Sequence, residues 1–152
     1  MSGEYEINSD TLMIVPVNSK IYKIIECNEE FLIEKNTTEM IDDSCKFFGS
    51  YYNGRFEGTK RMIGVNYKAP IVVEESREII FFPTSSPRFD NCYWICLNKI
   101  ESYEKCGKNT KIVFKNKIEY IVPISYRILE NQILRSTLLE SKLRSRKYSK
   151  MY

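Results

Sequence analysis

Residues 44–59 read SCKFFGSYYNGRFEGT and combine glycines, aromatic rings and cations in one short stretch. The adjacent Phe47 and Phe48 can anchor the segment to a core, and Gly49 permits the positive φ that a sharp change of direction requires. Beyond that turn, Tyr51, Asn53 and Arg55 are side chains suited to holding a partner. The alternative is a glycine-rich connector whose aromatic rings belong only to the core.

The composition indicates a single globular domain over residues 1–152. The apolar fraction of 43% and the charged fraction of 28% are those of a folded chain. No apolar run approaches the length of a membrane span, and the acidic start MSGEYEINSD does not resemble a signal peptide. A cytoplasmic location is therefore expected.

Histidine is absent, so His-based triads, His general bases and His-containing zinc sites are excluded. The five cysteines are odd in number and irregularly spaced, and Cys92 and Cys96 match no common zinc pairing. Free thiols are expected, with no metal and no cofactor.

Charge is unevenly distributed along the chain. Residues 1–43 carry a net charge of −7, whereas residues 44–126 and 127–152 carry +5 each. This asymmetry favours a polyanion such as nucleic acid as the partner of one face. Chance clustering on a solvated surface is the alternative.

Alternating and β-branched residues predict an α+β fold with a mostly antiparallel sheet body of about six to nine strands. Hairpins are expected from 20–27 with 31–34, from 70–74 with 78–82, and from 110–114 with 118–122. Asn116 is expected to take the left-handed position in the last of these turns. Residues 36–43 predict only a short helical turn.

Two helices are expected, a short middle helix over residues 55–63 and a long C-terminal helix from Ser125 to about Lys147. Ser125 is a suitable N-cap. An apolar stripe on the long helix comprises Ile128, Leu129, Ile133, Leu139 and Leu143. Leu134 and Leu138 lie off this stripe and predict a subunit interface, whereas residues 143–152 are expected to form a basic, mobile tail.

Four blocks, in order, resemble the competence transcription factors of the ComK type. They span about two-thirds of the chain and are SCKFFGSYYNGRFEGT, KAPIVV from Lys68, IIFFPTSSPRFDNCYWI from Ile79 and PISYRILENQILRSTLLESK from Pro123. The resemblance implies a bacterial, nucleoid-associated activator that binds paired A/T-rich boxes from the minor groove. It also implies dimers or dimers of dimers and a possible proteolysis adaptor as partner. Family members often continue past the helix, so a short member lacking the C-terminal extension is expected.

Minor-groove binding directs attention to cations in loops, because narrow A/T-rich grooves attract inserted arginine. Arg55 and Arg88 are predicted to enter the groove, since both lie in loop-like blocks. The residues expected to hold phosphates are Lys46, Lys60, Arg61, Ser85 and Ser86. The remaining predicted DNA-binding residues are Ser50, Tyr51, Asn131, Gln132 and Arg135.

Two further hypotheses differ in class from a DNA-binding activator. The first is a non-activating paralogue or protein-interaction module that pairs with a longer family member through Leu134 and Leu138. The second is an enzyme built on carboxylates such as Glu57, Asp90 or Glu101, which nothing in the sequence brings together.

Overall fold

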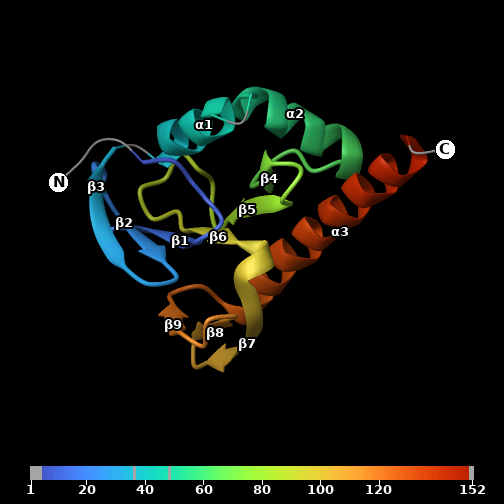
Figure 1. Ribbon diagram of the computed structural model, residues 1–152. Helices are drawn as coiled ribbons and strands as arrows, with labels where there is room; N and C mark the ends of the chain where they lie inside the picture. The colour runs from blue at the N-terminus through green and yellow to red at the C-terminus, as the bar shows by residue number, and fades with distance from the viewer. Residues whose placement is uncertain (1–4, 36, 48, 151–152) are drawn as a thin grey trace.

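The computed structural model describes residues 5–35, 37–47 and 49–150, without the side chains of residues 37, 38, 47 and 147–150. The core role expected for Phe47 and Phe48 therefore lies outside the described residues. Within them, a central antiparallel sheet carries helices on one face and a smaller sheet with a long helix on the other (Figure 1). The expected α+β class is confirmed.

The central sheet has six strands in the order β3-β2-β1-β6-β5-β4. The predicted hairpins β2–β3 and β4–β5 are present, and β1 joins the two halves by pairing with β6 at Ile14 and Trp94. The strands are β1 (Thr11–Pro16), β2 (Ile21–Glu26), β3 (Glu30–Glu34), β4 (Ile71–Glu74), β5 (Ile79–Pro83) and β6 (Trp94–Cys96).

Both faces of this sheet are buried, which explains why its middle strands are apolar throughout. In β5, Ile79 and Phe81 pack on the side of the first two helices, whereas Ile80 and Phe82 point to the other side. Trp94 in β6 is 0% exposed and belongs to the same core cluster as Ile79 and Phe81.

Helices α1 (Thr37–Phe47) and α2 (Tyr52–Ile63) cover one face of the sheet (Figure 1). The expected middle helix corresponds to α2, but residues 36–43 were expected to form only a turn and instead begin an 11-residue helix. Met40, Ile41 and Cys45 of α1 are buried against the sheet, so tertiary packing stabilises a helix whose sequence is mostly polar. Gly49 has φ +86° in the junction between the helices, as predicted.

A second sheet, in the order β7-β8-β9, lies on the opposite side of the central sheet. It contains β7 (Ile100–Cys106), β8 (Asn109–Phe114) and β9 (Glu119–Val122), and it follows a short 3-10 helix, η1 (Leu97–Lys99). The predicted β8–β9 hairpin is confirmed, although Lys117 rather than Asn116 takes the left-handed conformation, with φ +73°.

Helix α3 (Tyr126–Lys150) packs along β5, η1 and α2. The Ser125 hydroxyl accepts a hydrogen bond from the Ile128 N–H at 3.2 Å, so the predicted N-cap is confirmed. The helix continues to Lys150 rather than ending near Lys147. Its buried stripe includes the polar residues Gln132 and Ser136, whereas Ile128 is 40% exposed and does not belong to it. In the described part of the chain, no helix has the length and apolar character needed to cross a bilayer.

Candidate nucleic-acid interface

The junction between α1 and α2 is fixed by one carboxylate. Asp42 Oδ1 accepts the Tyr52 N–H at 2.8 Å at the start of α2, and Asp42 Oδ2 lies 3.1 Å from the Lys46 ammonium. The Tyr52 N–H lowers the pKa of Asp42, burial opposes this effect, and Lys46 adds to the lowering. Lys46 is exposed, but its ammonium forms an ion pair with the Asp42 carboxylate.

Arg55, in the first turn of α2, bonds to a neutral group. Its Nε donates to Ser50 Oγ at 3.0 Å, and Ser50 Oγ donates to the Cys45 carbonyl at 3.3 Å. Over the residues that the structure describes, Arg55 forms no ion pair, so its positive charge is not neutralised within the protein. Tyr51 is 57% exposed beside it.

The β5–β6 loop contains the second predicted arginine. Its base is closed by hydrogen bonds between Thr84 and Tyr93, including Tyr93 N–H to Thr84 Oγ1 at 3.0 Å. Arg88 is exposed with its guanidinium 5.6 Å from the Phe89 ring centroid, and no carboxylate in the described ranges pairs with it. Ser85 and Ser86 are half-buried in the same loop.

The helix junction and this loop meet around Tyr52. The Tyr52 ring lies edge-on to Trp94 with centroids 6.4 Å apart. Burial raises the pKa of Tyr52 to about 12, and the nearby thiols of Cys92 and Cys45 contribute to the increase. Tyr52 packs against the core cluster that contains Cys92 and Trp94, so the start of α2, which carries Arg55, adjoins the base of the β5–β6 loop.

The middle of α3 requires a correction. Gln132 is 1% exposed, and its Nε2 donates to the carbonyls of Lys68 at 2.8 Å and Pro83 at 2.6 Å. It therefore ties the α2–β4 loop and the end of β5 to α3, and it is not available to DNA in this structure. Asn131 is exposed, as the prediction required.

Arg135 adds an aromatic partner that sequence reasoning missed. Its guanidinium lies 5.2 Å from the Tyr67 ring centroid, and Nη1 donates to the Tyr67 carbonyl at 3.3 Å. Tyr67 is 64% exposed, and such a paired ring and cation is suited to contacts with sugar or base edges. The only sequence signal for it was a tyrosine in the loop between Gly64 and Pro70.

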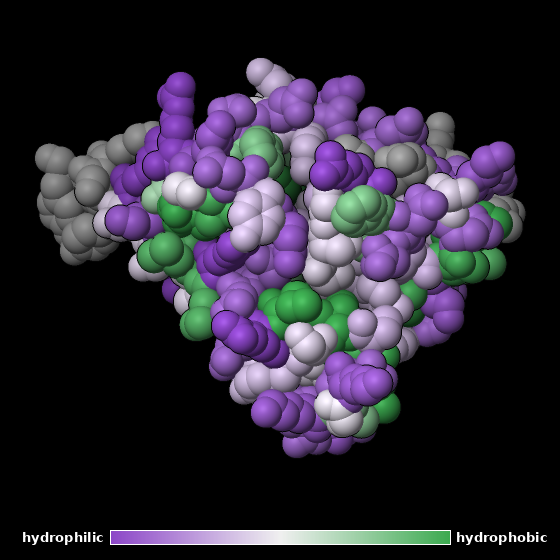
Figure 2. Space-filling view, turned by 180° about the vertical axis from the view of Figure 1, so that it is seen from behind, coloured by the Kyte–Doolittle hydropathy of each residue, from purple (hydrophilic) through white to green (hydrophobic). Residues whose placement is uncertain are grey.

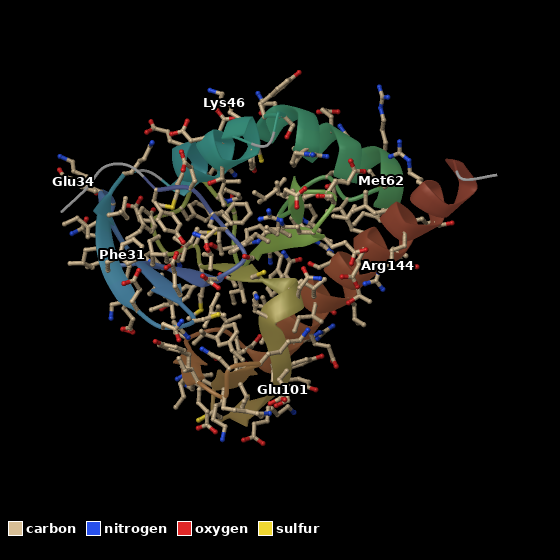
Figure 3. All side chains as sticks on the ribbon, in the orientation of Figure 1. Phe31, Glu34, Lys46, Met62, Glu101 and Arg144 are labelled. Carbon is tan, nitrogen blue, oxygen red and sulfur yellow. The ribbon has the colours of Figure 1, made fainter. Side chains whose placement is uncertain are left out.

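Lys60 and Arg61 are exposed at the opposite end of α2 from Tyr52. Figure 3 shows Met62 of this end beside the C-terminal half of α3, and Met62 and Ile63 pack against a buried cluster that includes Leu143. The structure thus separates these two cations from the Arg55 end of the same helix. Leu134 and Leu138 are 61% and 46% exposed on α3.

Seen from behind, the surface is mainly hydrophilic with a hydrophobic area low in the centre (Figure 2). The carboxylates of the enzyme hypothesis lie on different elements: Glu57 on α2, Asp90 in the β5–β6 loop and Glu101 on β7. Glu101 is bonded to Lys117 at 2.6 Å.

Comparisons with known proteins identify the family. The family model described as ComK protein matches residues 2–148. The competence transcription factor of Bacillus subtilis (strain 168) is 35% identical over 146 residues, which cover 93% of this chain and 76% of that protein. No solved structure matches significantly. The relative is a transcription factor, which excludes the enzyme hypothesis. Because the family model matches residues 2–148, the chain belongs to the ComK protein family.

Proposed function

We propose that this chain is a DNA-binding transcriptional activator of bacterial competence genes that recognises paired A/T-rich boxes largely through the minor groove. The similarity to a competence transcription factor supports the regulatory role. The basic balance of residues 44–152 supports an anionic partner.

The observation that carries the proposal is the bonding of Arg55. A neutral hydroxyl, Ser50 Oγ, orients the guanidinium without cancelling its charge. An arginine that enters a minor groove must bring an uncompensated charge, because attraction to the negative potential of the narrow groove drives its insertion. Arg88 meets the same condition in the adjoining loop.

The remaining contacts divide by the chemistry that each side chain offers. Lys60 and Arg61, at the end of α2, pair with no carboxylate among the described residues and are assigned to phosphates. The hydroxyls of Ser85 and Ser86 are assigned to phosphates as well. Lys46 contributes less because Asp42 already lies 3.1 Å from its ammonium. Arg135, with the Tyr67 ring, extends the surface along α3.

The test is a binding titration of the purified chain on two duplexes of equal length, one with A/T-rich boxes and one rich in G/C. Each titration is run at about 50 mM and about 200 mM salt, because an interface led by phosphate contacts loses affinity steeply over this range. Tighter binding to the A/T-box duplex is expected at both concentrations. Equal affinities for the two duplexes would remove the claim of sequence-preferring recognition.

A second proposal concerns assembly. Leu134 and Leu138 form an exposed pair one helical turn apart on α3, away from the stripe buried against the sheet. We propose that this pair forms the contact between subunits, either in a dimer of this chain or in a pair with a longer family member.

A further inference from the structure

We propose that the β7–β8 hairpin is a second DNA-binding element that holds the phosphate backbone beside the groove contacted by Arg55 and Arg88. We call it the basic hairpin and define it as residues 100–114, with Lys105 and Lys108 at its tip. The inference rests on the proposed DNA binding and assigns to the same duplex a contact outside every residue considered so far.

Charge is the first observation. Residues 99–117 contain six lysines and two glutamates, a net charge of +4 in a short segment. The glutamates pair with lysines away from the tip: Glu104 with Lys111 at 2.8 Å and Glu101 with Lys117 at 2.6 Å. In the described residues, Lys105 and Lys108 have no carboxylate partner, and both are exposed.

The shape of the hairpin is the second observation. In β7, only Ile100 and Tyr103 are partly buried, and the other five residues are exposed. Figure 1 shows this sheet projecting below the central sheet, and Figure 3 shows Glu101 at its outer side. Most of β7 thus faces solvent at one edge of the three-stranded sheet, and exposed β-strands are among the elements that proteins use to reach DNA.

The tip is also held in a defined position. Thr110, which pairs with Lys105 across the strands, is 0% exposed, and its hydroxyl donates to the Ile124 carbonyl at 2.7 Å. The Lys105 ammonium lies 5.8 Å from the Tyr126 ring centroid, and Tyr103 packs on the same ring at 5.4 Å. These contacts attach the tip to the first turn of α3.

That turn adjoins the loop that carries Arg88. A cleft of about 520 Å³ is lined both by Ser85 and Asn91 of the β5–β6 loop and by the N-cap Ser125 and Ile128 at the start of α3. Tyr126 lies between Ser125 and Ile128 in the sequence, and its ring forms the cation–π contact with Lys105. The basic hairpin therefore extends the candidate interface past the start of α3, and its contacts are to phosphates because lysine carries a point charge without a fixed base-reading geometry.

The experiment compares the unmodified 152-residue chain with two variants of equal charge. Lys105→Gln with Lys108→Gln removes the free cations of the tip, and Lys111→Gln with Lys117→Gln removes the paired cations of the same sheet. Affinity for an A/T-box duplex and for a G/C-rich duplex is measured over a salt series. In the tip variant, the negative slope of log K against log salt is expected to become shallower by about 1.8, because each of the two lost phosphate contacts accounts for about 0.9. Its loss of affinity is expected to be the same on both duplexes, since phosphates carry no sequence.

The paired variant serves as the control and is expected to keep the wild-type slope. Lysine acetylation with and without DNA, read by mass spectrometry, gives an independent measurement in which DNA should protect Lys105 and Lys108 more than Lys111 and Lys117. Equal slopes for the two variants, or a tip variant that self-associates while binding DNA normally, would overturn the inference. Wild-type protein that binds neither duplex would instead overturn the proposed function.

Discussion

At the scale of single residues, neighbours decide whether a polar side chain faces outward or inward. Arg55 and Gln132 were both predicted to contact DNA. Arg55 has a neutral partner at the surface, whereas Gln132 has its amide nitrogen between two backbone carbonyls inside the fold. The first is suited to binding, and the second to stability.

Arg55→Ala is expected to weaken binding to A/T-box DNA by about 1–3 kcal/mol while leaving the free energy of unfolding within about 0.5 kcal/mol of wild type. The reason is that the substitution removes an uncompensated charge, and that within the described residues the Arg55 side chain forms a single, partly buried hydrogen bond. Arg144→Ala is the control, because that guanidinium is bound to both Glu78 oxygens at 2.8 and 2.7 Å. Equal loss of DNA affinity in the two variants would contradict the special role of Arg55.

Gln132→Ala is expected to lower the free energy of unfolding by about 1–3 kcal/mol, because the Lys68 and Pro83 carbonyls lose their donor. Urea denaturation measures this loss. Asn131→Ala, at the preceding and exposed residue, should leave the free energy of unfolding nearly unchanged. A stable Gln132→Ala variant with impaired DNA binding would restore the original prediction and refute the buried role.

At the scale of elements, Asp42 joins two helices by accepting a hydrogen bond from the Tyr52 N–H. Asp42→Ala is expected to cost about 1 kcal/mol of stability at neutral pH, as does the loss of other helix caps. Because folding lowers the pKa of Asp42, its contribution is complete above the ordinary value of about 3.9 and is lost as the pH falls through the folded value. The difference between wild type and variant should therefore shrink only in acid.

Thermal unfolding followed between neutral pH and about pH 3 measures this difference. Asp43→Ala is the matched control, since that carboxylate pairs with Lys35 and accepts no helix N–H among the described residues. A gap between wild type and Asp42→Ala that stays constant to the lowest pH would show that the carboxylate charge is not what stabilises the junction.

Elements with a regular apolar pattern were predictable from the sequence, and those that depend on distant partners were not. The strands of the central sheet and the N-cap of α3 follow local rules, as Ser125 illustrates. Helix α1 escaped prediction because its buried side chains are few, and β7 because it is mostly exposed. In the site, the loop at Arg88 could be identified, whereas Arg55 was expected in a loop-like block and instead lies in the first turn of α2. The Tyr67–Arg135 pair and the burial of Gln132 arise from contacts between residues 49 to 68 positions apart.

At the scale of the whole molecule, α3 contributes one face to the core and leaves Leu134 and Leu138 exposed. Leu134→Glu with Leu138→Glu is expected to reduce the mass in solution to that of one chain, because charge at an apolar contact between subunits is costly to bury. Light scattering gives the mass, and Ser141→Glu with Ser145→Glu supplies the same charge on exposed positions of the helix. A double leucine variant that retains the wild-type mass would show that the contact lies elsewhere.

The pairing of β1 with β6 has a consequence for synthesis on the ribosome. Met13 lies beside Ile95, so the centre of the sheet joins residues about eighty positions apart in the chain. The first three strands can emerge and pair among themselves, yet their inner edge has no partner until β6 has left the exit tunnel. Until then the nascent chain presents an open strand edge, the kind of surface that chaperones shield and that invites misassembly with other chains.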